Sequence, residues 1–157
     1  MGLSKDETAD LTAINTWVFD LDNTLYPAEI NLFAQVDHRM GEFIAAELDM
    51  SYDDARKLQK QYYRDHGTTL NGLMTEHGMA PEAFLDYVHD IDVSMVKPDA
   101  ELDRLLGELP GRRIVFTNGS LAHAERVIAH LDVGHHFDEI YDIAAADFVP
   151  KHHPDTF

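Results

Sequence analysis

The chain has 157 residues, enough for one ordinary domain or for a small domain that carries an insertion. Hydrophobic residues make up 45 % of it, which suits a packed core, and no stretch approaches the apolar length of a membrane span. Lys and Arg number 12 against 29 Asp and Glu, a formal net charge of −17. This charge disfavours binding to nucleic-acid polymers and to membranes. A phosphate site in so acidic a chain would need a local cation, for which a divalent metal is the obvious source.

Cysteine is absent from the sequence, which excludes disulfides and thiolate metal sites. The first residues, MGLSKDETADLTAIN, lack the basic and then apolar layout of a secretory signal. Both observations favour a reducing compartment, and we expect a cytoplasmic protein.

The first predicted element is a short strand, TWVFD (16–20), which is rich in β-formers and is interpreted as buried. Apolar residues then recur at helical spacing, and Ser51 marks the start of a second helix. The segments TTLNGLMTEHG (68–78) and PEAFLDYVHDI (81–91) predict two further short helices. The apolar stripe of the first helix consists of Phe33, Val36, Met40, Phe43, Ile44 and Leu48. An all-helical block therefore follows the first strand directly.

Helices and strands alternate in the rest of the chain. The segment DAELDRLLGEL (99–109) predicts a helix, and Arg113–Phe116 predicts a strand. Ser120 is placed to cap the next helix, and Glu139–Ile143 predicts a third strand. The expected inward residues of the two helices are Leu102, Leu105, Leu106 and Leu109, and Leu121, Ala124, Val127, Ile128 and Leu131. This alternation predicts an α/β fold, a Rossmann-like parallel sheet with an all-helical cap inserted after the first strand.

We expect the chain to divide into an α/β core, residues 1–27 and 92–157, and a helical cap, residues 28–91. Ligands bind in parallel α/β sheets at the carboxyl ends of the strands. Asp20 and the turn Thr117-Asn118-Gly119 fall at such ends, so the cap would cover them like a lid.

Asp20 and Asp22 stand two positions apart at the end of an apolar run. Two unpaired carboxylates in a dry environment are unfavourable, so a cation is expected to face them. The alternative is an ordinary strand-end turn with solvated acids, since Asp-Asn pairs are common in turns.

The segment DLDNT (20–24) resembles the first motif of the haloacid dehalogenase-like hydrolases, D-x-D-x-T/V, and IVFTN (114–118) resembles their second motif. Lys151 stands at about the place of their third motif, although His152-His153 follows it where the family usually has proline. FDLDNTLYP, YRDHGTTLNGL and FTNGSLAHAERV are similar to the pyrimidine 5′-nucleotidase-like branch of that superfamily. The resemblance covers most of the chain.

The resemblance implies a magnesium-dependent phosphatase in which Asp20 attacks phosphorus and Asp22 acts as general acid and base. Mg²⁺ would bind the Asp20 carboxylate and the Asp22 backbone carbonyl. The residues implied to position the first loop or to hold phosphoryl oxygens are Thr24, Thr117, Asn118, Gly119 and Lys151. The expected substrate lid of the cap, where the branch has its own signature, comprises Arg64, His66, Thr68, Thr69, Leu70 and Asn71.

The family's fourth motif, an apolar strand that ends in two acids, is absent from the sequence, which ends at Phe157. In the family this motif completes the magnesium site, and its strand pairs beside the first one. We therefore expect either a truncated form of a longer hydrolase or a partner, such as a second copy of the chain, that covers the sheet edge.

The leading hypothesis is a hydrolase of a small phosphate monoester, in particular a pyrimidine nucleoside 5′-monophosphate, acting through an aspartyl-phosphate. The alternative is a catalytically impaired remnant that binds phosphate ligands or a protein partner. The two hypotheses differ in turnover, which metal-dependent hydrolysis of p-nitrophenyl phosphate would detect.

The histidine pairs His135-His136 and His152-His153 raise the question of a zinc site. Adjacent histidines are expected to point in different directions, so a solvated surface is the preferred interpretation of the histidines. Four aromatic residues of the helical block are interpreted as the core of the cap: Tyr62, Tyr63, Phe84 and Tyr87.

Overall fold

The computed structural model describes residues 11–154, and within that range the sheet has three parallel strands. They are β1 (Thr16–Phe19), β2 (Arg112–Phe116) and β3 (Glu139–Tyr141), with β2 in the centre. Val18 pairs with Ile114, which pairs in turn with Glu139. The predicted α/β class with a parallel sheet is therefore confirmed. Most of the N-terminal segment, whose sequence lacks the layout of a secretory signal, lies outside the described residues.

β3 ends at Tyr141, earlier than the sequence predicts, because the next residue turns the chain. The two carboxylate oxygens of Asp142 accept hydrogen bonds from the backbone N–H groups of Leu121 and Ala145. The loop that follows β3 therefore turns away from the line of the strand, and the start of the following helix is tied to it.

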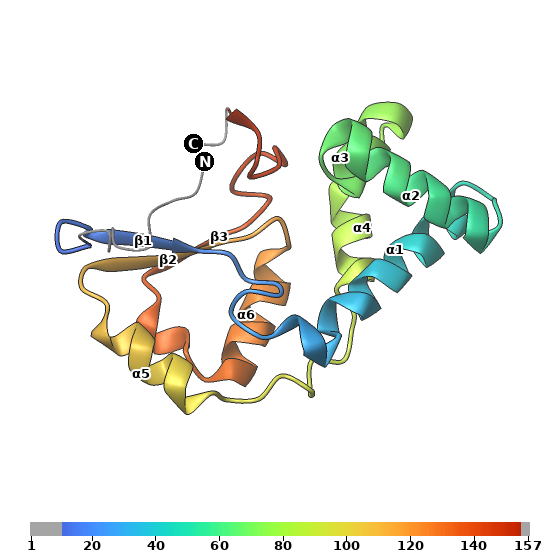
Figure 1. Cartoon of the computed structure of the whole chain (residues 1–157). Helices are drawn as coiled ribbons and strands as arrows, with labels where there is room; N and C mark the ends of the chain where they lie inside the picture. Colours follow the sequence, from blue (N-terminus) through green and yellow to red (C-terminus); the bar gives the residue numbers. More distant parts are fainter. Residues whose placement is uncertain (1–10, 155–157) are drawn as a thin grey trace, which may run out of the picture.

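Two helices of the core, α5 (Ala100–Glu108) and α6 (Leu121–Leu131), lie on the same side of the sheet (Figure 1). Their buried apolar side chains are Leu106, Ala124, Val127, Ile128 and Leu131. The prediction that Leu105 and Leu121 also point inward is wrong, because these side chains are 45 % and 43 % exposed. Leu106 is the buried residue of α5, so the predicted apolar stripe is wider than the face that the core covers.

The first strand is less buried than the sequence predicts. Val18 is 58 % exposed, whereas Phe19 on the opposite face packs edge-on against Phe137 with ring centroids 5.7 Å apart. Among the described residues β1 pairs with β2 alone, so it is an edge strand. Parallel sheets usually have both faces covered. The expectation that another copy or a further segment covers this edge stays a prediction.

The described residues between β1 and β2 contain no strand, and four longer helices stand there before α5. They are, after a short turn η1 (Ala28–Ile30), α1 (Leu32–Glu47), α2 (Tyr52–His66), α3 (Thr69–His77) and α4 (Pro81–Val88). As Figure 1 shows, α1–α4 form a unit beside the core, connected to it by the segments before α1 and after α4. None of the helices within residues 11–154 is long and apolar enough to cross a membrane.

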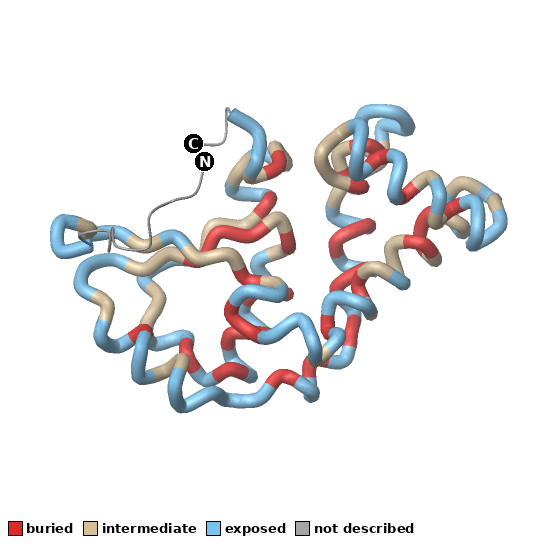
Figure 2. Tube along the Cα trace, in the orientation of Figure 1, coloured by how far each residue is buried: buried red, intermediate tan, exposed pale blue. Residues whose placement is uncertain are grey.

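The cap has an apolar interior of its own, and Figure 2 shows buried stretches on the facing sides of its helices. Phe43 of α1 meets Phe84 of α4 edge-on, with ring centroids 5.3 Å apart. Tyr62 and Phe84 belong to the core of the cap, as predicted. Tyr63 and Tyr87 do not, because they are 65 % and 36 % exposed.

Candidate active site

The carboxyl ends of the three strands bring together residues that are far apart in the sequence. Asp20 follows β1, Thr117 follows β2, and Lys151 lies in the loop after β3. The chain turns sharply after Asp20, because Leu25 donates a backbone hydrogen bond to Leu21 and Asn23 adopts a positive φ of 60°. The strand register therefore places an acid, a hydroxyl and a cation at one edge of the sheet.

Both carboxylate oxygens of Asp20 have partners. Oδ2 accepts a hydrogen bond from Thr24 Oγ1 at 2.9 Å, and Oδ1 forms an ion pair with Lys151 Nζ. The lysine is itself held in place, since its backbone N–H donates to Asn118 Oδ1 at 2.9 Å. The side chains of Asp20 and Lys151 remain 39 % and 28 % exposed, so a ligand can reach them.

Asp22 is more enclosed than Asp20, with a side chain that is 16 % exposed. Its Oδ1 atom accepts hydrogen bonds from Tyr26 OH at 2.7 Å and from His123 Nε2 at 2.8 Å. Burial raises the pKa of Asp22, but the hydrogen bond and charge of His123 and the hydrogen bond of Tyr26 outweigh burial and lower it. Burial, together with the charge of Asp22, raises the pKa of Tyr26, so this phenol stays a donor.

Two histidines of this site were not identified from the sequence. His123 of α6 is 1 % exposed, and the ring of His89 stacks on it with centroids 4.3 Å apart. Burial, followed by the neighbouring His123, lowers the pKa of His89 to about 3, and its Nδ1 lies 3.0 Å from Ser120 Oγ. The interpretation of the histidines as solvated surface is therefore wrong for these two. The available signal was spacing, because His123 precedes the buried Val127 by four residues on one helical face.

The turn after β2 is suited to an anion. Thr117 is 2 % exposed, and its Oγ1 accepts a hydrogen bond from the Gly119 N–H at 3.0 Å. Ser120 caps α6 by accepting from the His123 N–H. The amino end of α6 consequently points its partial positive charge toward the strand ends.

A cavity of about 620 Å³ lies between these strand ends and the cap. Its core side includes Asp20, Asp22, Thr117, Asn118, Gly119 and Lys151. Its cap side combines apolar and polar residues. The apolar ones are Phe33, Val36, Met40, Leu70, Phe84, Leu85 and Val88, and the others are Asp37, Gln59, Lys60, Tyr63, Arg64, Thr68 and Thr69. The volume falls in the range of small-molecule sites.

Only some of the predicted lid residues line the cavity. Arg64, Thr68, Thr69 and Leu70 line the cavity. Asn71 does not line it, and its side-chain amide donates to the His66 carbonyl at 2.9 Å, which fixes the turn between α2 and α3. His66 pairs with Glu76 at 3.2 Å instead of facing the cavity.

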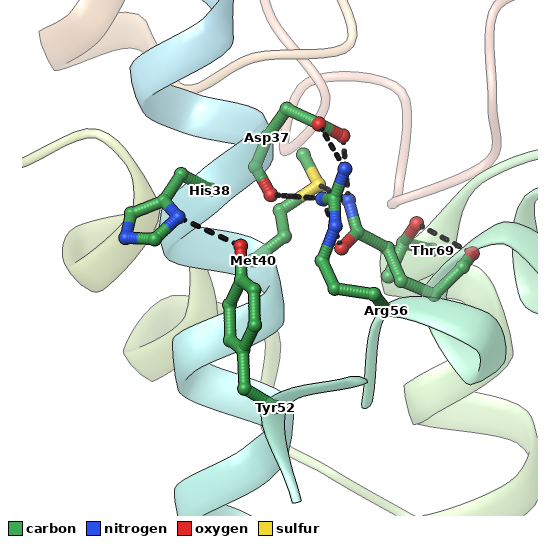
Figure 3. Close-up of polar contacts among 7 residues, drawn as sticks. Asp37, His38, Met40, Tyr52, Arg56 and Thr69 are labelled. Atoms are coloured by element: carbon green, nitrogen blue, oxygen red, sulfur yellow. Dashed lines mark hydrogen bonds and ion pairs between the residues drawn. The ribbon is translucent and has the colours of Figure 1, made fainter. Parts of the chain in front are cut away.

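A polar network in the cap wall was also not identified from the sequence, and Figure 3 shows Asp37 of α1 facing Arg56 of α2. Arg56 Nη2 donates to Asp37 Oδ2 at 2.5 Å, and Gln59 Nε2 donates to Asp37 Oδ1 at 2.8 Å. The hydrogen bond to Asp37 raises the pKa of Arg56. The backbone carbonyl of Gln59 accepts from Thr69 Oγ1 at 3.2 Å, so the network ties three cap helices together beside the cavity.

The loop that carries Lys151 also touches the cap. A Cβ atom added to Gly67 would lie 2.2 Å from the Nε2 atom of His152. Gly67 has a φ of +82°, which favours glycine, and its missing side chain lets the histidine ring approach the turn between α2 and α3. Core and cap are thus in contact immediately beside the lysine.

The rings of His135 and His136 are oriented differently from the prediction. Both Nε2 atoms face the same oxygen, Oδ1 of Asp103, at 3.1 and 2.7 Å. The expectation that these adjacent histidines point in different directions is therefore wrong. The tight turn η2 (Gly134–His136) brings both rings to one side of the chain.

The fold and its cavity are those of a capped α/β protein with charged groups at the carboxyl edge of a parallel sheet, where ligands of such folds bind. Residues 14–157 match the haloacid dehalogenase-like hydrolase family, and the chain belongs to that family. It is also similar to Phosphate metabolism protein 8 of Saccharomyces cerevisiae, with 29 % identity over 140 residues. That match covers 82 % of this chain and 43 % of the yeast protein, so the chain spans less than half the length of this relative.

Proposed function

We propose that the chain acts as a magnesium-dependent phosphatase that hydrolyses a small phosphate monoester through an aspartyl-phosphate on Asp20. The observation that carries this proposal is the environment of the Asp20 carboxylate. It lines the cavity, its oxygens are held by Thr24 and Lys151, and Asp22 lies two residues further along the same turn. Family membership and the name of the yeast relative support phosphate chemistry.

Asp20 is the proposed nucleophile, because an oriented carboxylate can attack phosphorus, displace the alkoxide and divide one difficult step into two. Thr117 and the backbone of the turn that follows it would hold the phosphoryl oxygens, with help from the amino end of α6. Lys151 would offset the charge of the phosphoryl group in both steps.

Asp22 is the proposed general acid and base. Its Oδ1 is occupied by Tyr26 and His123, which leaves Oδ2 to carry the proton. The lowered pKa of Asp22 suits the second step, in which a carboxylate must accept a proton from water. The negative charge of an arriving phosphate raises the proton affinity of the same carboxyl group, which suits the first step.

The donors in this turn fit magnesium, because Asp20 offers a partly exposed carboxylate and Asp22 a backbone carbonyl, both hard oxygen ligands. When bound there, Mg²⁺ would neutralise charge on the phosphoryl oxygens. Lys151 shares the Asp20 carboxylate and would remain close to the same oxygens.

The proposed substrate is a pyrimidine nucleoside 5′-monophosphate. The cavity is large enough for a nucleotide, and its cap side combines apolar surface with Arg64, Thr68 and Thr69. These groups suit a flat base with polar edges. The similarity of the cap segment to the nucleotidase-like branch supports the same choice.

The test is a panel of nucleoside and sugar monophosphates, assayed for phosphate release with and without Mg²⁺. We expect release with Mg²⁺, fastest with pyrimidine nucleotides, and loss of at least about three orders of magnitude in the variant Asp20→Asn. The matched control is Asp65→Asn, which changes an exposed carboxylate of α2. Turnover retained in Asp20→Asn would remove the nucleophile, and phosphate binding without turnover in the wild type would favour the non-catalytic alternative.

A further inference from the structure

A second group of possible metal ligands lies away from the cavity. Asp103 of α5 and His135 and His136 of η2 each offer one ligand atom, and these atoms lie within 4.8 Å of one another. None of the three lines the cavity. η2 leads into the amino end of β3, whereas the candidate active site is at the carboxyl ends of the strands.

We infer that Asp103, His135 and His136 form a binding site for a divalent transition-metal ion, with Zn²⁺ as the occupant. Two imidazoles and one carboxylate are a donor set that suits zinc, whereas Mg²⁺ and Ca²⁺ prefer oxygen ligands alone. The three side chains would leave one position of a tetrahedral site to water.

The ring of His136 is already fixed in the orientation that such a site needs. Its side chain is 13 % exposed, and a Cβ atom added to Gly107 would lie 3.3 Å from its Cε1. Gly107 stands one helical turn after Asp103, so the ring lies over α5 with Nε2 directed at the carboxylate. A pre-positioned ligand reduces the entropy lost when an ion binds.

His135 supplies the adjustable part of the site. Its side chain is 61 % exposed, and its Nε2 lies 3.1 Å from the same Asp103 oxygen. Ligand atoms around zinc are separated by roughly 3.4 Å, given metal–ligand bonds of about 2.1 Å in a tetrahedron. The two nitrogen–oxygen separations of 2.7 and 3.1 Å would therefore widen to admit the ion, and the two nitrogen atoms lie within 4.8 Å of each other.

A bound ion would join α5 to the turn that leads into β3. The two elements come from separate parts of the chain, residues 100–108 and 134–136, so the ion would act as a clamp within the core. Because the native chain would bind it and the unfolded chain would lack the assembled site, zinc would raise the melting temperature.

The experiment is a titration of the whole chain with Zn²⁺ alone as the probe, in excess Mg²⁺ so that oxygen-only sites are filled. Zinc bound per chain is measured after dialysis, and affinity by competition with a chelating dye. We expect the wild type to retain one more zinc per chain than His135→Gln after dialysis. The zinc affinity of the cluster should fall at least about tenfold in that variant, because losing even a residue that only hydrogen-bonds to a metal ligand lowers affinity by that much. His130→Gln is the matched control, because it removes an exposed histidine of α6 and leaves the cluster intact.

His135→Gln is the first variant because its exposed side chain can be replaced without disturbing the core. Asp103→Asn is the second, since the amide oxygen can still accept the histidine hydrogen bonds while the ligand charge is removed. We expect zinc to raise the melting temperature of the wild type and of His130→Gln, and to raise it less in both cluster variants. Equal zinc content and equal melting shifts in all four proteins would overturn the inference and leave the cluster as a hydrogen-bonded contact only.

Discussion

The two sides of the cavity are built by different means. On the core side, strand register brings Asp20, Thr117 and Lys151 together although 131 residues separate the first from the last, and the charged groups face the cavity. On the cap side, packing of helices provides the lining, and its polar residues Asp37 and Gln59 are bonded to each other and to Arg56. Under the proposed function, the core side would carry the reaction and the cap side would define the shape of the substrate. Substitutions on the core side should change turnover, and substitutions on the cap side should change substrate affinity.

After Asp20→Asn, the largest effect should come from Asp22→Asn on the core side. The amide keeps the size of the side chain and can still accept from Tyr26 or His123, but it can neither donate nor take up a proton as a carboxyl group does. We expect kcat to fall by about 10² to 10⁴, with a much smaller change in KM. Steady-state kinetics with the best substrate of the panel measure both constants. The variant should lose more kcat with phenyl phosphates that have poor leaving groups than with p-nitrophenyl phosphate, whose leaving group needs less help from an acid. This difference would support the role of Asp22 as the general acid.

The next largest effect should come from the contact between the two sides, at Gly67. Alanine there is strained at a φ of +82°, and its Cβ would push the His152 ring away from the turn. We expect this movement to reach Lys151, the adjacent residue of the loop. We expect at least a tenfold loss of kcat and a loss of about 1–2 kcal/mol in the free energy of unfolding. Activity assays and urea denaturation provide the two values.

Gly78→Ala is the matched control for this prediction. Gly78 also has a positive φ, +60°, but no atom lies within 4 Å of an added Cβ. It should lose stability by a similar amount and keep its kcat. The double variant Gly67→Ala with His152→Ala should regain much of the lost activity, and equal kcat values in the two single glycine variants would show that the cap does not position Lys151.

The fold and the core side of the site could be predicted because both follow from local pattern and from topology. Apolar spacing identified the helices, and strands that run parallel necessarily place Asp20 and Thr117 at one edge. The exposure of Val18 could not be predicted in this way, because a strand sequence does not state whether a neighbour covers it. The length of an apolar run indicates a strand, but how deeply that strand is buried depends on elements elsewhere in the chain.

The partners of Asp22 and the cap network were missed for a different reason. His123 lies 101 residues from Asp22, and the bond between them depends on the rotation of α6 about its axis. The contact of Asp37 with Arg56 depends likewise on how α1 crosses α2. Pairings of this kind are set by packing in three dimensions and leave only a weak periodic signal in the sequence.

On the cap side, Asp37→Asn should have a smaller effect and one of a different kind. An asparagine has one acceptor oxygen where aspartate has two, so its NH₂ group would face a donor of either Arg56 or Gln59. We expect a loss of about 1 kcal/mol in unfolding free energy for this partly exposed group. KM should rise several-fold while kcat changes little, because α1 and α2 would line the cavity less firmly. Asp65→Asn, on the exposed side of α2, should change neither constant.

Back on the core side, Tyr26→Phe should have a modest effect on rate and one with a pH signature. The ring is buried and would stay in place, but Asp22 Oδ1 would lose the hydrogen bond at 2.7 Å that lowers its pKa. The pKa of Asp22 should therefore rise, and the acidic limb of the kcat profile should move to higher pH, with a few-fold loss of kcat at its optimum.

The same substitution should change how stability depends on pH. A carboxyl group whose pKa is lower in the folded chain stabilises the fold at pH values above the unfolded pKa, and this contribution is lost as the pH falls. The difference in unfolding free energy between the wild type and Tyr26→Phe should accordingly be largest near neutral pH and shrink below the ordinary aspartate value of 3.8. Tyr52→Phe, which removes the phenol that lies 2.7 Å from His38 Nδ1 far from the strand ends, should leave the acidic limb unmoved. A profile of Tyr26→Phe that coincides with that of Tyr52→Phe would mean that the tyrosine holds Asp22 in place without setting its protonation.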